Sequence, residues 1–123
     1  MDKRSETGKL GEALALDCLK KNGYRIVETN YRCALGEIDI IATEGKTVVF
    51  IEVKSRKTDR FGPPQAAVGI RKQRKISMLA KNYLKEKKLS NARARFDVIA
   101  VRLRNGNPKI EIIKNAFESS FGF

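Results

Sequence analysis

The stretch that decides the fold reads GEIDIIATEGKTVVFIEVKSR and spans residues 36–56. Two runs rich in β-branched and apolar residues, 37–43 and 47–55, are typical of strands, and only a short polar segment separates them. That segment contains Gly45 followed by Lys46, the order that a two-residue type II′ turn prefers. The sequence therefore predicts a β-hairpin in the middle of the chain.

The register of this hairpin determines which charged side chains meet. Side chains opposite each other in an antiparallel pair lie on the same face, so the turn gathers several charged groups there. The facing pairs that it predicts are Glu44 with Thr47, Asp39 with Glu52, and Glu37 with Lys54. A three-residue loop would instead place Glu52 on the opposite face from Asp39.

The second strand of the hairpin is apolar on both faces from Val48 to Ile51, as expected for a central strand that is covered on each side. Glu52 therefore begins within or at the edge of buried surface, where an unpaired carboxylate costs on the order of several kcal/mol. Two explanations remain open. Either Lys54 and the acids form an ordinary salt-bridged face, or a divalent cation lies between Asp39 and Glu52.

The composition narrows the chemistry. The chain has 123 residues, a net charge of +12 and no histidine, which excludes Ser-His-Asp and Cys-His catalysis and the common zinc sites. Carboxylate ligands without His or Cys select Mg²⁺ or Mn²⁺. The basic balance favours a polyanion as partner, a nucleic acid first and an anionic membrane surface second. Two cysteines without metal spacing and apolar runs of at most four residues lead us to expect a cytoplasmic protein without signal peptide or membrane contact.

The other elements follow from periodicity and turn residues. The expected order is α-β-β-β-α-β-β, and residues 1–123 are expected to form one α/β domain, a mixed central β-sheet flanked by helices. The expected ranges are a helix over 5–22, strands over 24–29, 37–43 and 47–55, a helix ending near residue 88, strands over 95–103 and 110–113, and a loose tail over about 114–123.

Glu12 is a further candidate acid, in the first predicted helix. It lies on the stripe that runs through Ala15, Leu16 and Leu19, so a helix packed on the sheet could direct it inward. A glutamate in the first turn is also favoured by the helix dipole alone. Both explanations stay open from the residues.

These residues match a known pattern. Asp39 followed by Glu52-Val53-Lys54 resembles the D…ExK signature of the restriction endonuclease-like, PD-(D/E)xK nucleases, with Ile38 in place of the proline. From residue 8 to about residue 100 the chain also resembles the YraN family, predicted endonucleases related to archaeal Holliday junction resolvases. The positions that carry this likeness are Gly8, Gly11-Glu12, Ala15, Gly23-Tyr24, Asn30-Tyr31-Arg32, Gly36 to Asp39, Phe50 to Lys54, Arg56, Gly62, Pro64, Ala67-Val68, Lys72 and Arg95 to Val98.

The resemblance implies a restriction endonuclease-like fold and a role for each site residue. The metal ligands that it implies are Asp39, Glu52, the backbone carbonyl of Val53, and Glu12. Lys54 would orient the attacking water, help to lower its pKa or neutralise charge on the phosphate. Glu37 matches the YraN pattern alone, and it either holds Lys54 in place or contacts the metal.

Residues 54–75 include eight basic side chains and a single acid. Such a run is either a solvated face or a track for a phosphate backbone, for which Arg56, Gln65 and Lys72 are the candidates. We therefore expect a metal-dependent DNA endonuclease, with branched DNA as a suitable substrate and a homodimer as the form that cuts two strands. The alternative is a non-catalytic nucleic-acid-binding protein on a nuclease-like scaffold.

Overall fold

The predicted hairpin is present and its turn is confirmed. The computed structural model describes residues 6–56, 68–104 and 107–120, and in it β2 (Gly36–Glu44) and β3 (Thr47–Arg56) are antiparallel neighbours. Gly45 has a φ of +61° and Lys46 has a negative φ, as a type II′ turn requires. The pairs from Glu44↔Thr47 to Ile40↔Ile51 follow the predicted register.

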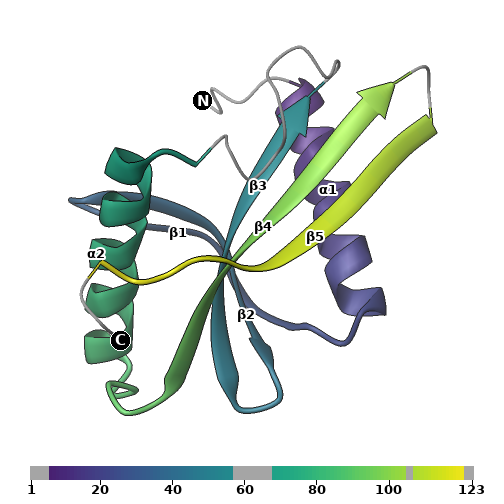
Figure 1. Cartoon of the computed structure of the whole chain (residues 1–123). Helices are drawn as coiled ribbons and strands as arrows, with labels where there is room; N and C mark the ends of the chain where they lie inside the picture. The colour runs from purple at the N-terminus through teal and green to yellow at the C-terminus, as the bar shows by residue number, and fades with distance from the viewer. Residues whose placement is uncertain (1–5, 57–67, 105–106, 121–123) are drawn as a thin grey trace.

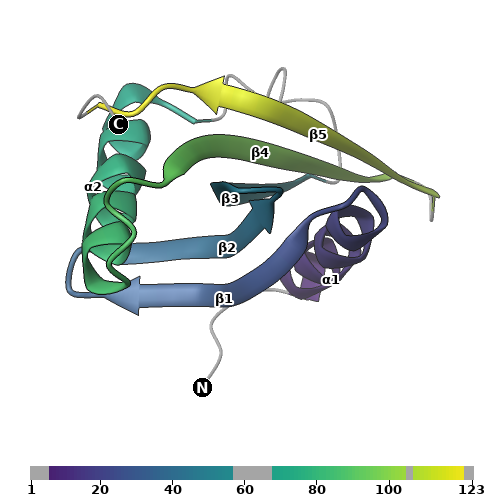
Figure 2. The ribbon, with the colours of Figure 1, turned by 90° about the horizontal axis from the view of Figure 1, so that it is seen from below.

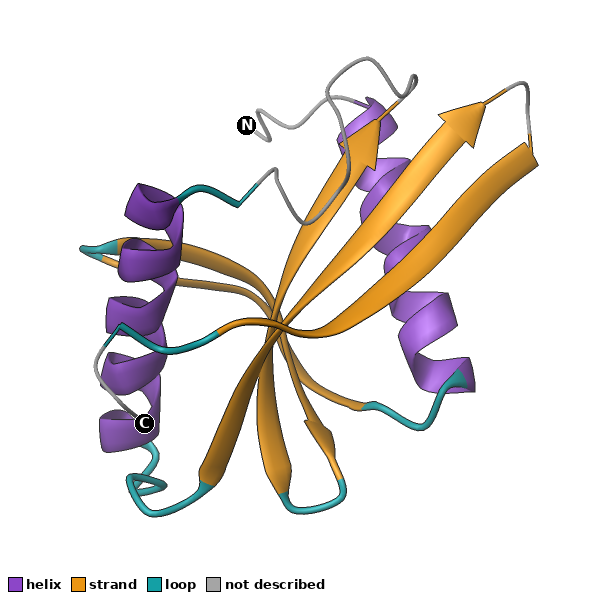
Figure 3. Cartoon of the chain, viewed as in Figure 1, coloured by secondary structure: helices purple, strands orange, loops and turns teal. Residues whose placement is uncertain are grey.

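The hairpin lies inside a five-stranded mixed sheet with the strand order β1-β2-β3-β4-β5 (Figures 1 and 3). The other strands are β1 (Arg25–Cys33), β4 (Arg93–Arg104) and β5 (Asn107–Phe117). Among these five strands only β3 and β4 are parallel neighbours, because the connection between them crosses over through α2 (Ile70–Glu86). The α/β class, the mixed sheet and the order α-β-β-β-α-β-β are as predicted.

The two helices cover opposite faces of the twisted sheet (Figure 2). On one face, α1 (Glu6–Lys21) packs Ala15 and Leu19 against Val49 and Ile51. On the other face, α2 buries an apolar stripe in the same core cluster as Phe50, and the members of the stripe are Ile76, Leu79, Ala80, Tyr83 and Leu84. No helix in the described ranges is long and apolar enough to span a membrane.

Both edge strands extend further than predicted. The first strand was expected to end at residue 29, but Asn30-Tyr31-Arg32 also belongs to β1. The expectation of a loose tail from residue 114 is wrong for residues 114–117, because β5 continues to Phe117. The Phe117 ring stacks on Phe96 with a centroid distance of 4.9 Å, so burial of aromatic surface extends the strand.

A buried acid ties four segments together on the α1 face. Asp97 is 1% exposed, and it accepts hydrogen bonds from the Tyr24 hydroxyl (2.7 Å), the Arg95 guanidinium (2.8 Å) and the Asn115 backbone N–H (2.9 Å). Arg95 also donates to Glu44 at the end of β2. Charged partners and hydrogen bonds offset the desolvation of this carboxylate, which makes the network a structural anchor.

Candidate functional site

β2 and β3 separate at the end of the hairpin far from the turn. Their pairing stops at Ile40↔Ile51, whereas β2 remains paired with β1 as far as Gly36 and β3 remains paired with β4 as far as Arg56. Figure 1 shows β1 and β2 turning away from β3 here. We call this opening the β2–β3 fork, and its functional side chains are those of Asp39, Glu52 and Lys54. The predicted strand pairs Asp39–Glu52 and Glu37–Lys54 do not form.

The side chain of Asp39 explains why the ladder ends. Its Oδ2 accepts a 2.8 Å hydrogen bond from the Val53 backbone N–H, a group that would otherwise face the β2 backbone. The alternation of faces also breaks here, because Ile38 and Ile41 both pack beneath α2 while Ile40 packs beneath α1. At the fork, the Asp39 carboxylate thus takes the place of a backbone carbonyl of β2 as the acceptor for the Val53 N–H. Counting residues from the turn does not predict this change.

Glu52 lies opposite Asp39 across the fork and is only 8% exposed. Its Oε1 is 3.6 Å from the Nζ of Lys54 and 3.5 Å from the Nζ of Lys72. Lys54 comes from the same strand, whereas Lys72 comes from the first turn of α2. The crossover helix therefore brings a second cation to the buried acid.

The charges at the fork oppose one another. Burial, the charge of Glu52 and, to a smaller degree, the charge of Glu37 raise the pKa of Asp39 to about 7, while the Val53 N–H and Lys72 act in the opposite direction. Asp39 thus loses its proton near neutral pH, far above its ordinary value of 3.8. The fork is an environment in which additional positive charge would stabilise the ionised form.

Glu12 reaches the neighbourhood of the fork from α1. Its Oε1 accepts a 3.1 Å hydrogen bond from the Asn30 side-chain amide, and Asn30 falls opposite Asp39 in the β1–β2 register. The helix can approach because Gly11 has no side chain: a Cβ there would lie 1.8 Å from the Oγ of Ser55 on β3. Glu12 is therefore directed inward, as one of the two explanations predicted.

Glu37 has a different partner from the one predicted. Its Oε2 accepts from the Arg32 Nε at 2.6 Å, across the β1–β2 pair. The suggestion that it holds Lys54 is wrong, because β2 leaves β3 before Glu37 is reached. Glu37 still contributes to the site electrostatically, since its charge helps to raise the pKa of Asp39.

The donor set fits a hard divalent cation in its chemistry. Asp39 and Glu52 supply carboxylate oxygens, and the N–H and C=O of one strand residue leave on the same side, so the Val53 carbonyl is on the Asp39 side of β3. Across the described ranges, no three His, Cys, Asp or Glu side chains are already gathered closely enough to hold a metal. Binding such an ion would therefore require side chains to move. Glu52, for example, would have to leave Lys54 and Lys72 and turn toward the ion.

Comparison with known proteins identifies the family. Residues 11–101 match the model of the uncharacterised protein family UPF0102. A UPF0102 protein of Syntrophus aciditrophicus is 53% identical over 122 residues, covering 99% of this chain and 96% of its own. A UPF0102 protein of Geotalea uraniireducens is 52% identical over 115 residues, with 93% and 91% covered. The chain belongs to the UPF0102 family. The expected YraN membership is thereby confirmed.

Of the three residues that the sequence suggested for contact with a phosphate backbone, the structure of this UPF0102 chain describes two. Lys72 has a partly exposed side chain (45%) that pairs with Glu52. Arg56 ends β3, and its Nη1 donates to the Ser55 carbonyl at 3.1 Å. Gln65 lies outside the described residues.

Sequence reasoning missed Asn30 as a member of the UPF0102 site. Asn30 has a φ of +54°, a conformation that asparagine tolerates better than most residues, and this allows its amide to reach Glu12. The available signal was its place among the positions that carry the YraN resemblance, but only the length of β1 places it beside Asp39.

Proposed function

We propose that this protein is a Mg²⁺- or Mn²⁺-dependent endonuclease that hydrolyses DNA phosphodiester bonds in the cytoplasm, with branched or junction DNA as a substrate. The observation that carries the proposal is the pair Asp39 and Glu52 at the fork. Burial and, after it, repulsion by Glu52 raise the pKa of Asp39 to about 7, and a bound divalent cation would offset both effects. A structural sheet end needs one acid to accept from the Val53 N–H, and a second acid beside it adds repulsion.

The ion would be held by Asp39, Glu52, the Val53 carbonyl and Glu12. When bound, it would polarise a phosphate oxygen and lower the pKa of a water molecule. Asp39 is already oriented for this role by its bond to the Val53 N–H. Asn30 orients Glu12 through its amide. These two contacts fix Asp39 and Glu12 in advance, while Glu52 would have to exchange its lysine partners for the ion.

Lys54 and Lys72 supply the positive charge for the substrate. Both ammonium groups lie near Glu52 Oε1, at 3.6 Å and 3.5 Å. In the substrate complex, Lys54 would turn to the scissile phosphate and stabilise the charge that develops there. Lys72, on the first turn of α2, would bind the same phosphate or its neighbour, and the N–H groups of that turn favour an anion too.

A non-catalytic nucleic-acid-binding protein is the second candidate, and one observation favours it. Each acid at or near the fork has a partner within the protein: Asp39 has the Val53 N–H, Glu52 has two lysines, Glu37 has Arg32, and Glu12 has Asn30. Such pairing is what a cluster retained only for structure would show. The fold cannot separate the two candidates, because one scaffold supports many functions.

The deciding experiment incubates the pure protein with four-way junction, flap, duplex and single-stranded DNA, with and without Mg²⁺ or Mn²⁺. Asp39→Asn and Glu52→Gln are compared with Asp17→Asn, an exposed acid on α1 paired with Lys21. We expect metal-dependent cleavage that falls at least about a hundredfold in the two site variants and not in the control.

Two outcomes contradict the assignment in different ways. Cleavage that survives both Asp39→Asn and Glu52→Gln would show that the chemistry lies elsewhere. Salt-sensitive binding without cleavage of any substrate would instead establish the non-catalytic alternative. Light scattering on the same samples measures the mass of the free protein and of its junction complex, and we propose a homodimer on the junction.

A further inference from the structure

Three basic residues form a row across three neighbouring strands. Arg56 is the register partner of Arg102, and Arg102 is the register partner of Lys109, so the three side chains lie side by side on one face. Side chains alternate between the two faces along a strand, so Glu52, Lys54 and Arg56 of β3 share one face. The three basic residues therefore lie on the same face as Glu52 and Lys54. We call these three residues the basic row.

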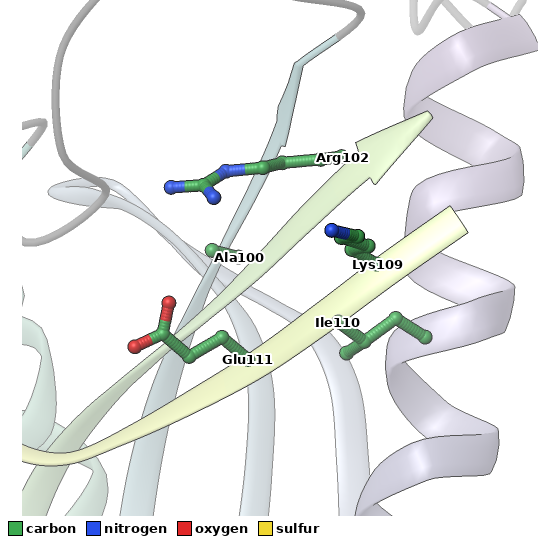
Figure 4. Close-up of a pocket in the computed structure, with 5 residues that line it drawn as sticks. All are labelled: Ala100, Arg102, Lys109, Ile110 and Glu111. Atoms are coloured by element: carbon green, nitrogen blue, oxygen red, sulfur yellow. The ribbon is translucent and has the colours of Figure 1, made fainter. Parts of the chain in front are cut away.

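A shallow hollow borders the basic row on the side of the fork. Its volume is about 300 Å³, and it is lined by Ala100, Arg102, Lys109, Ile110 and Glu111. Figure 4 shows the short side chain of Ala100 between Arg102 and Glu111, whose charged ends extend to the same side of the sheet. Ala100 is the register partner of Lys54, so the hollow lies on the same strand level as the proposed catalytic lysine.

The basic row concentrates positive charge on one face of the sheet. Glu111 and Lys54 lie one level away, where Ala100 is the register partner of both. A polyanion on this face would be attracted by these basic side chains, and the distance from Lys54 to Arg56 along β3 is only about 6.6 Å.

We propose that Arg56, Arg102 and Lys109 bind the phosphate backbone of the nucleic acid next to the phosphate at the fork. This inference rests on the proposed function, because it takes the strand held at Asp39 and Glu52 as its ligand. The basic row extends the contact from β3 onto β4 and β5, and the hollow at Ala100 leaves room for the sugar between two phosphates. This contact would depend on the charge of the backbone and would not distinguish one base sequence from another.

The test measures DNA binding by fluorescence anisotropy in EDTA, where no metal-dependent cleavage occurs. Arg102→Ala and Lys109→Ala are compared with Lys46→Ala, which removes an exposed lysine at the opposite end of β3. Affinities for duplex DNA are measured between about 50 and 200 mM salt. We expect each row variant to lower the slope of log K against log salt by about 0.9, alike on every sequence, and the control to leave it unchanged.

Two further measurements test whether a changed slope could arise from unfolding of the variants or from the loss of a site for free phosphate. Thermal melting should show that the row variants remain folded at the temperature of the binding assay, so that a changed slope reports binding. Inorganic phosphate at matched ionic strength is the second ligand, and the row variants should not change its binding. The proposal is overturned if both variants keep the wild-type slope, or if only inorganic phosphate binding is lost.

Failure of the proposed function would look different. If the wild type binds DNA through the basic row but cleaves no substrate with Mg²⁺ or Mn²⁺, the nuclease proposal fails and the binding site stands. If cleavage requires Asp39 and Glu52 while Arg102→Ala and Lys109→Ala bind and cut like the wild type, the basic row fails and the nuclease proposal stands.

Discussion

Replacement of Asp39 by asparagine should make the metal-free protein more stable and remove its activity. The amide side chain of the Asp39→Asn variant would keep a carbonyl oxygen for the Val53 N–H, but it would bring no charge next to Glu52. The folded pKa of about 7, against an ordinary value of 3.8, corresponds to about 4 kcal/mol at about 1.36 kcal/mol per pKa unit. Because Asp39 is only partly buried, we expect a gain in unfolding free energy of about 2–4 kcal/mol at pH 8.

The sign of the pH dependence follows from the raised pKa. Between pH 3.8 and about pH 7 the folded state holds the Asp39 proton while the unfolded chain has lost it. The contribution of Asp39 to the free energy of unfolding therefore falls as the pH rises through this range, and it levels off above it. The advantage of Asp39→Asn should grow from pH 5 to pH 8.

Urea denaturation in EDTA at pH 5 and pH 8 measures this difference. Asp17→Asn is the matched control, and it should stay within about 0.5 kcal/mol of the wild type at both pH values. Mg²⁺ at about a hundred times its dissociation constant should stabilise the wild type by about 2.7 kcal/mol and Asp39→Asn by much less. The reasoning is refuted if Asp39→Asn is no more stable than the wild type at pH 8, or if its advantage is the same at both pH values.

Two predictions concern the scaffold, and both use urea denaturation. Asp97→Ala should lower the free energy of unfolding by about 3–5 kcal/mol, because it leaves the Arg95 charge without its buried partner. Tyr24→Phe should lower it by about 1 kcal/mol, the value of one hydrogen bond. A loss below about 1 kcal/mol for Asp97→Ala would contradict the anchor role. Gly11→Ala should cost about 1–3 kcal/mol, because the new Cβ would lie 2.9 Å from the Ser55 Cβ. Gly69→Ala has open space and should change little, and equal effects of the two would refute close packing at Gly11.

Local patterns in the chain were sufficient for the framework. The order of elements, the type II′ turn at Gly45 and the pairs next to it followed from turn chemistry and periodicity, which act over a few residues. The same reasoning failed further from the turn. The register error at Glu37 arose because a strand can leave its neighbour when a side chain such as that of Asp39 satisfies the backbone.

The extent of β1 and β5 was also beyond local reasoning. Tyr31 and Phe117 are held in strands by rings that approach from other elements, Tyr83 in α2 and Phe96 in β4. Such contacts depend on how the helices cross the sheet, and no window of sequence contains both partners.

The sequence by itself determined which chemistry is available to this protein. The absence of histidine leaves carboxylates and lysine as the candidate groups, and residue types set ligand preference, so any metal that these acids bind is expected to be a hard cation. The tertiary structure decided which of these groups meet. Lys72 reaches Glu52, Asn30 holds Glu12, and Arg56, Arg102 and Lys109 align in one row, because helix crossover and strand register join residues that are distant along the chain.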